Sequence, residues 1–181
     1  GTELDWFEKW KAQRMKWHLA LGTPANKLKF KDHDNLAHYA NAATDIQFEF
    51  PFGFKELEGI HSRTDFDLKS HQELSGKKLT YFDQEKNEAY VPYVVETSIG
   101  ADRMFLAMLS NNLKEESVPD SKGEDSTRLV FKIHPALAPV KCAVLPLVKN
   151  KEELTSKAKT IYDKLKLQFQ CQYDDKDAIG R

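Results

Sequence analysis

The stretch from Val94 to Arg103, Val-Val-Glu-Thr-Ser-Ile-Gly-Ala-Asp-Arg, constrains the fold of this chain more than any other part of the sequence. Its apolar start predicts a strand, in which side chains two positions apart share a face, so Glu96 and Ser98 are expected to point together into a small polar pocket. Gly100 permits a tight turn at the strand end. Arg103 then opens an apolar helix, where a guanidinium can hold a phosphate or stack on a flat ring. These features predict a site for a small cationic substrate beside a nucleotide.

Composition sets broad limits on the remaining chain. The 181 residues include 27 basic and 28 acidic side chains, so the net charge of -1 does not indicate an RNA binder. The hydrophobic fraction of 40% supports a packed core. We see no signal peptide and no apolar run long enough to cross a bilayer, and we therefore expect a cytoplasmic protein without membrane partners.

The two cysteines, Cys142 and Cys171, are far apart in the sequence and have no CxxC spacing. This pattern argues against a zinc site and is typical of a reduced cytosolic protein. Cys142 lies in an apolar run and is expected to pack as a small hydrophobic residue.

Periodicity and breaker residues predict an alternation of helices and strands. The predicted helices cover residues 4–21, 34–43, 65–74, 103–113 and 151–169. The predicted strands cover residues 44–58, 78–83, 88–96, 140–148 and 170–173. The charged stretch 112–127 is expected to be an exposed loop. The order strand, helix, strand after residue 140 predicts a parallel pair with a right-handed crossover.

Three sequence blocks, in the same order as in a known family, carry a specific resemblance. They are Phe52-Gly-Phe-Lys-Glu-Leu-Glu-Gly-Ile-His-Ser-Arg-Thr-Asp-Phe-Asp-Leu68, Glu96-Thr-Ser-Ile-Gly-Ala-Asp-Arg103 and His134-Pro-Ala-Leu-Ala-Pro-Val-Lys141. With them, essentially the whole chain resembles the homodimeric, class II glycyl-tRNA synthetases. The second block is similar to motif 3 of that family, and the third is similar to the junction into its anticodon-binding domain.

The resemblance implies an α+β fold. Residues 1–133 would be the C-terminal part of a class II antiparallel-sheet catalytic core, and residues 134–181 the first part of an α/β anticodon-binding domain. Motifs 1 and 2 have no counterpart in the sequence. We therefore expect a piece of a longer protein that is inactive by itself.

The resemblance also implies a reaction. The full-length protein would activate glycine with ATP and Mg²⁺ to glycyl-adenylate and esterify the 3′ end of tRNA(Gly), as a homodimer and without zinc, haem or flavin. A first alternative is a non-catalytic paralogue that acts as a nucleic-acid-binding accessory protein. A second is a related class II ligase with another amino-acid substrate, and a third is a purely structural module with no ligand.

The family's site residues map onto two groups of positions. The resemblance assigns Glu96, Thr97, Ser98, Ile99 and Gly100 to glycine, and Glu56, Leu57, Gly100, Ala101, Asp102 and Arg103 to ATP. Arg103 would be the catalytic group, because it faces the charge that develops on the phosphates, and Glu56 would hold Mg²⁺. The class II signature usually has a second glycine near its arginine, and here Ala101-Asp102 occupies that gap.

Simpler readings of the same residues remain open at this point. Glu96 also fits an edge-strand carboxylate paired with a lysine, and Ser98 fits a cap of the following helix. Glu56 fits an exposed strand residue, and Arg103 fits a helix-start arginine paired with Asp102 or Glu96.

A polar cluster lies close to the Glu56 strand in the sequence. Two-residue alternation would place Glu58 on the same face as Glu56, in support of the site. The cluster His61, Arg63, Asp65 and Asp67 is expected to be structural, since the acids precede a helix. Arg63 is expected either to brace the pocket or to face the acceptor end of the tRNA.

Overall fold

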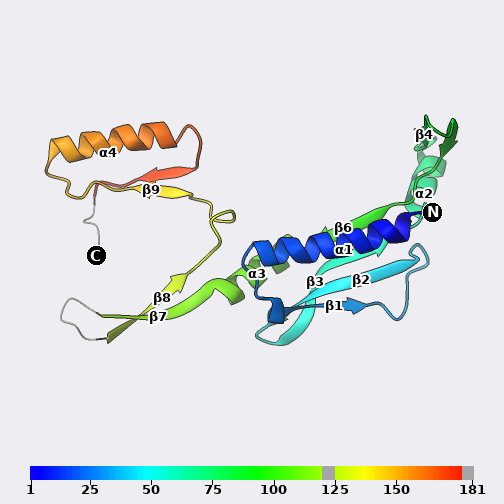
Figure 1. Cartoon of the computed structure of the whole chain (residues 1–181), viewed down its shortest axis with the longest axis horizontal. Coiled ribbons are helices and arrows are strands. Elements are labelled where there is room, and N and C mark those ends of the chain that lie inside the picture. The colour runs from blue at the N-terminus through cyan, green and yellow to red at the C-terminus, as the bar shows by residue number, and fades with distance from the viewer. Residues whose placement is uncertain (120–124, 177–181) are drawn as a thin grey trace. The chain divides into compact units, whose positions relative to one another are not determined.

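The computed structural model describes residues 1–119 and 125–176. The chain divides into two compact units, Gly1–Lys132 and Ile133–Arg181. Both contain helices and strands, and antiparallel pairing dominates the first unit (Figure 1). The predicted α+β class is confirmed at this level.

A four-stranded antiparallel sheet is the centre of the first unit. Its order is β1-β2-β3-β6, formed by Leu28–Asp32, Ala42–Phe50, Gly53–Ser62 and Val95–Ile99. The single strand predicted over residues 44–58 is wrong, because the chain reverses after β2 and β3 returns beside it. Gly53, at the reversal, has a φ of 98°, which a residue with a Cβ adopts only at a cost.

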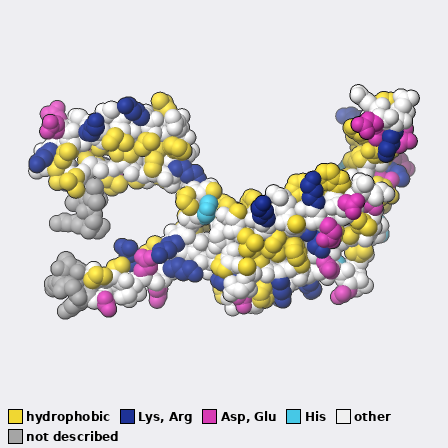
Figure 2. All heavy atoms as spheres, in the orientation of Figure 1, with side chains coloured by type: hydrophobic (Ala, Val, Ile, Leu, Met, Phe, Trp, Pro, Cys, Tyr) yellow, Lys and Arg dark blue, Asp and Glu magenta, His cyan; other side chains and the backbone are white. Residues whose placement is uncertain are grey.

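One face of this sheet is covered by α1, which spans Glu3–Ala20 close to the predicted bounds (Figure 1). Phe7 of α1 joins a buried cluster with alternate residues of β2, including Ile46 and Phe48. Each such side chain contributes about 1.5–3 kcal/mol on burial. Hydrophobic side chains are also exposed on the surface of the first unit (Figure 2). On α1 they include Trp6 and Trp10.

The remaining elements of the first unit are short. They are η1 (Ala25–Lys27), α2 (Phe66–Ser75), β4 (Tyr81–Asp83), β5 (Glu88–Tyr90), α3 (Ala101–Asn112), β7 (Leu113–Pro119) and β8 (Asp125–Phe131). The helix predicted over 65–74 and the strand pair around the turn at 84–87 are confirmed. The predicted strand 88–96 is divided, because β5 pairs with β4 whereas β6 pairs with β3.

Two predictions in this unit are wrong. No helix forms over residues 34–43, because Ala42 and Ala43 pair with β3 and the residues before them form a connection. The predicted loop 112–127 is largely a hairpin of β7 and β8, while its residues 120–124 lie outside the described part. Its strands are exposed and charged, with Glu116 paired to both Arg128 and Lys132, so the sequence lacks an apolar alternation.

The second unit contains β9 (Cys142–Val144), α4 (Glu152–Leu165) and β10 (Cys171–Tyr173). β9 and β10 pair in parallel, as predicted, although both β9 and α4 are shorter than predicted. The helix α4 packs on this pair, and its Ala158 is buried. None of the helices in the part described is long and apolar enough to cross a membrane.

Candidate functional site

A bulge in β3 determines which side chains share a face of the sheet. Glu58 pairs with Ile46, but Glu56 pairs with the adjacent Gln47, so Leu57 is the extra residue. Paired residues of antiparallel strands share a face, and neighbouring residues of one strand do not. Glu56 and Glu58 therefore lie on opposite faces, and the prediction that they share one is wrong.

The same register places the predicted polar residues together. Glu96 pairs with His61, and Ser98 pairs with Gly59, which in turn pairs with Asp45 of β2. These residues share the face of Gln47, and hence of Glu56. We call it the site face: it lies opposite α1 and carries Glu56, Gly59, His61, Glu96 and Ser98.

The carboxylate of Glu96 is held by Arg63, which follows β3. Arg63 Nη1 donates to Glu96 Oε2 at 2.7 Å, and Arg63 Nε donates to Asp67 Oδ2 at 2.6 Å. The guanidinium also lies over the ring of Tyr39, 4.1 Å from its centroid. The hydrogen bonds that Arg63 donates to Asp67 and Glu96 raise the pKa of Arg63, and the bond from Arg63 lowers the pKa of Asp67. Because one guanidinium lies between two carboxylates, Arg63, Asp67 and Glu96 together carry a net charge of minus one.

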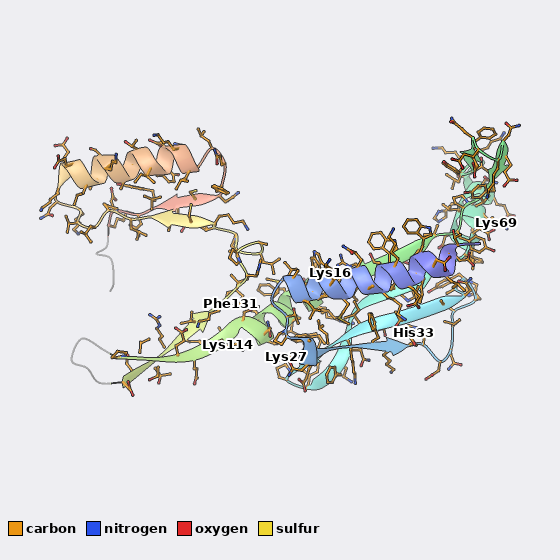
Figure 3. The ribbon with its side chains drawn as sticks, viewed as in Figure 1. Lys16, Lys27, His33, Lys69, Lys114 and Phe131 are labelled. Carbon is orange, nitrogen blue, oxygen red and sulfur yellow. The ribbon has the colours of Figure 1, made fainter. Side chains whose placement is uncertain are left out.

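Gly59 and His61 form the floor beside Ser98. A Cβ at Gly59 would lie 2.6 Å from His61 Cε1, so the imidazole occupies the space that a side chain at Gly59 would need. His61 Nδ1 is buried and has no hydrogen-bond partner among the described residues. The ring also packs edge-on against His33, which follows β1 (Figure 3). His33 Nε2 donates a 2.9 Å hydrogen bond to Asp45 Oδ1.

Most of the residues assigned to ATP line a single hollow of about 620 Å³. It is formed by Glu56, Gly100, Ala101, Asp102, Arg103 and Leu106. Arg103 Nη1 donates to the backbone carbonyl of Glu56 at 2.9 Å and lies 3.5 Å from its carboxylate. The first turn of α3 therefore lies against β3, and the exposed guanidinium is anchored at the edge of the hollow.

The other assigned residues do not turn their side chains to the site face. Leu57 is 2% exposed and belongs to the core. Thr97 and Ile99 pair with Ile60 and Glu58, so their side chains are on the α1 side of the sheet. Any part that these three residues take in a site would use their backbone groups.

Gly100 was expected to permit a tight turn at the strand end, but its backbone conformation is not one that needs glycine. Its φ of −75° is accessible to any residue, and a Cβ there would make only an ordinary contact with Arg103 Cβ at 3.6 Å. The turn between β6 and α3 therefore does not require glycine. The position matters instead because it leaves the wall of the hollow without a side chain.

The purely structural alternatives for Ser98, Glu96 and Arg103 do not match the contacts that these residues make. Ser98 does not cap α3, since Gly100 is the N-cap and no side-chain cap bond forms there. Glu96 is paired, but with Arg63 rather than a lysine. Arg103 pairs with Glu56, and not with Asp102 or Glu96.

Glu58, on the α1 side, forms a separate buried ionic cluster. It is 1% exposed and accepts hydrogen bonds from Arg14 and from His18 Nε2, the latter at 2.7 Å. Burial raises the pKa of Glu58, but the bonds from His18 and Arg14 and the charge of Arg14 outweigh burial and leave the pKa below its usual range. The cluster ties α1 to β3 beneath the site face.

Among the described residues, no group of three or more His, Cys, Asp or Glu side chains could hold a metal ion alone. A Mg²⁺ ion commonly takes one or two carboxylates and completes its coordination with nucleotide phosphates and water. Glu56 and Asp102, which both line the hollow, fit that requirement.

A larger hollow of about 710 Å³ lies elsewhere in the first unit, between α1 and the segment around β5. Trp6, Trp10, Tyr90 and Tyr93 line it, and none of the predicted site residues does. We take the smaller hollow as the candidate site, because Arg103 and Glu56 line it and because Glu96 lies on the same face of the sheet as Glu56.

Comparison with known proteins finds relatives that match the whole chain. The glycine–tRNA ligase of Chlorobaculum tepidum is 51% identical over 182 residues, which cover 100% of this chain. Those of Agathobacter rectalis and Treponema denticola are 47% and 46% identical, also over 100% of the chain. The chain is homologous over its whole length to glycine–tRNA ligases. No family model matches it.

The homology to glycine–tRNA ligases concerns part of those proteins. The chain spans 37% of the Chlorobaculum tepidum ligase, 38% of the Agathobacter rectalis ligase and 41% of the Treponema denticola ligase. The resemblance stated from the three sequence blocks is thereby confirmed. The roles of individual residues follow from geometry and chemistry, and not from these identities.

Sequence reasoning left two roles open for Arg63 and missed the His61–Gly59 contact. Arg63 was treated as structural and was expected either to brace the pocket or to face the acceptor end of the tRNA, and its hydrogen bond to Glu96 agrees with the first of these roles. The signal was the acid at Asp67, four positions later on the helix, which binds the same guanidinium. For His61, the useful signal was the glycine two positions earlier, since a ring can lie over a residue without a side chain.

Proposed function

We propose that this chain carries the glycine pocket and part of the nucleotide site of a glycine–tRNA ligase. The observation that carries the proposal is the shared site face. Glu96 and Ser98 lie on it, and Glu56 reaches it through the bulge at Leu57. Homology to glycine–tRNA ligases over the whole chain supports the same reading.

The acidic pocket suits the ammonium group of a free amino acid. Glu96 Oε2 accepts the hydrogen bond from Arg63, whereas Glu96 Oε1 accepts no hydrogen bond from the described residues and is available to a ligand. Because Arg63, Glu96 and Asp67 together retain one negative charge, a cation is favoured beside them. Ser98 would accept a second hydrogen bond from the ammonium. A side chain on the substrate would meet the floor formed by Gly59 and His61, and such steric exclusion favours glycine.

Arg103 would act on the nucleotide. Its anchor on the Glu56 carbonyl holds the guanidinium in place before substrate binds, and fixed positive charge stabilises the charge that develops during attack on a phosphate. When bound, Mg²⁺ would neutralise phosphate charge, with Glu56 and Asp102 as the available carboxylates. The residues of this chain would position the substrates and stabilise the phosphate charge, because the reaction needs no enzyme nucleophile.

The wider assignment follows from the same proposal. The unit Gly1–Lys132 would be part of a class II catalytic core, and Ile133–Arg181 the start of an anticodon-binding domain. The substrates would be glycine, ATP and tRNA(Gly), and the whole protein would act as a homodimer in the cytoplasm.

The test is a chimeric ligase, in which this chain replaces the homologous segment of the Chlorobaculum tepidum ligase. We expect ATP–pyrophosphate exchange that depends on glycine, is absent with alanine or serine and is abolished by Glu96→Ala. Glu85→Ala, at an exposed turn position, is the matched control. The chain alone should show no exchange. A folded chimera without glycine-dependent exchange would favour the non-catalytic paralogue, and exchange with another amino acid would favour a ligase of different specificity.

A further inference from the structure

The two cysteines meet in the second unit, at a distance from the candidate site along the chain. Cys142 of β9 and Cys171 of β10 are paired residues of the parallel strands, and their sulfur atoms are 3.0 Å apart. Both thiols are free and half-buried. The sequence prediction that Cys142 merely packs as a small hydrophobic residue overlooks this contact, because residues 29 positions apart are brought together only by the crossover.

The backbone places the pair within reach of a disulfide. Neighbouring strands are about 4.7–4.9 Å apart, and disulfide-bonded residues usually have Cα atoms about 4.4–6.8 Å apart. The sulfur atoms would have to approach by about 1 Å to reach the bond length of about 2.05 Å. A change of that size is available to side-chain rotation within a two-stranded sheet.

The pattern of burial along β9 and β10 places both thiols on the same side of these two strands. Along each strand the burial alternates, so Cys142 and Val144, like Cys171 and Tyr173, are half-buried, while Ala143 and Gln172 between them are exposed. Both cysteines therefore face the side that α4 covers. The hydrogen bond with Cys142 and burial raise the pKa of Cys171 to about 11, so this thiol is protonated at neutral pH and reacts slowly as a nucleophile.

We propose that Cys142 and Cys171 are a modification site, at which a small-molecule disulfide of the glutathione class converts the two thiols into a cross-strand disulfide. One cysteine thiolate attacks the glutathione disulfide and releases one glutathione thiolate, which leaves a mixed disulfide. The second cysteine thiolate attacks the protein sulfur of that mixed disulfide and displaces the second glutathione thiolate. The protein loses two protons and two electrons, and one glutathione disulfide becomes two glutathione thiols.

The bond would close a loop that contains α4. It would restrict the unfolded chain, and it would join β9 to β10. The described part of this unit buries little apolar area, and its buried apolar residues are Pro146 and Ala158. Its resistance to unfolding should therefore respond strongly to a covalent link.

The test uses the 181-residue chain, whose two cysteines allow a single intramolecular disulfide. The reduced chain is equilibrated with mixtures of reduced and oxidised glutathione, free thiols are alkylated, and the products are weighed by mass spectrometry. The same equilibrium is measured in concentrated guanidinium chloride. We expect the folded chain to form the disulfide with an equilibrium constant at least about tenfold greater than the unfolded chain. A peptide joining Cys142 to Cys171 should appear after proteolysis.

Two variants separate this proposal from nonspecific oxidation. Cys142→Ser and Cys171→Ser should stop at the mixed disulfide with glutathione, and oxidation should raise the denaturation midpoint of the unsubstituted chain alone. Formation should accelerate as pH rises, because the thiolate is the attacking species. The proposal is overturned if the folded chain favours the disulfide no more than the unfolded chain, if it accumulates glutathione adducts, or if its disulfides join two chains.

Discussion

Arg63 and Glu96 are joined by a 2.7 Å hydrogen bond that spans from the end of β3 to the first half of β6. The same guanidinium binds Asp67 in α2, so one side chain fixes both the pocket carboxylate and the helix after β3. The orientation of Glu96 is therefore set before any substrate arrives, which reduces the ordering cost of binding.

Replacement of Arg63 should weaken glycine binding selectively. In the chimeric ligase, Arg63→Ala should raise the KM for glycine by roughly 10- to 100-fold, since a hydrogen bond to a charged group contributes about 1.5–3 kcal/mol. Arg63→Lys should lose less, because lysine keeps the charge and lacks the planar fork. Steady-state exchange at varied glycine and varied ATP measures both effects. An equal rise in the KM for ATP would contradict the assignment.

Arg103 should matter for chemistry more than for folding. We expect Arg103→Ala to lower kcat for exchange by about 100- to 1,000-fold, the loss typical when a group that stabilises transition-state charge is removed. Its side chain is exposed, so the denaturation midpoint should change little. Arg128→Ala is the matched control, because it removes another exposed arginine that is paired with a carboxylate outside the candidate site. A kcat loss in Arg128→Ala as large as that in Arg103→Ala would argue against this role.

Glu58 should be one of the most costly residues to replace. Glu58→Ala removes one partner of a buried ionic cluster and leaves Arg14 and His18 facing a cavity, so we expect a loss of about 3–5 kcal/mol in the free energy of unfolding. Urea denaturation of the chain measures this loss. Glu49→Ala, at an exposed position of β2, should cost far less. Equal losses for the two variants would show that the cluster adds nothing.

The same residue predicts a pH dependence. The pKa of Glu58 is lowered on folding, so the unfolded chain takes up a proton first as the pH falls. The stabilisation is fully present above the unfolded pKa of 4.5 and is lost progressively below it. Glu58→Gln should therefore show a smaller decline in stability than the unsubstituted chain as the pH is lowered through and below this value, measured by urea denaturation at constant ionic strength.

Gly59 and His61 should show strong coupling. Gly59→Ala places a methyl group where His61 Cε1 lies, which should destabilise the chain by about 1–3 kcal/mol. His61→Ala removes the obstacle, so the double variant should be more stable than the sum of the single losses predicts. A double-mutant cycle in urea measures the difference, and simple additivity would refute the contact.

Local rules predicted most of the elements around the candidate site. The strand and helix that flank Gly100 were expected from apolar periodicity, and Glu96 and Ser98 do share a face. The parallel pair in the second unit also followed from the order strand, helix, strand. In each case the residues of one short segment contain all the information that the prediction needs.

The failures have a common physical origin in long-range pairing. Ala42 and Ala43 have high helix propensity, but pairing with Ser62 and His61 determines their conformation. The β7–β8 hairpin depends on cross-strand ion pairs such as Glu116 with Arg128, which no single segment reveals. The pairing of Glu96 with Arg63 is also long-range, because a helix and a hairpin separate the two residues, so the segments alone could not decide between the two roles expected for Arg63.

The bulge at Leu57 also limits which insertions and deletions the lineage can accept. Deletion of Leu57 would remove the extra residue and leave a regular ladder, in which Glu58 stays opposite Ile46 and Glu56 stays opposite Gln47, so both carboxylates would keep their faces. An added residue beside Leu57 would instead slip the pairing by one position, place Glu56 opposite Phe48 and turn its carboxylate to the α1 side. Length changes in homologues should therefore exclude insertions at this point of β3 and accumulate in connections such as the one between β4 and β5.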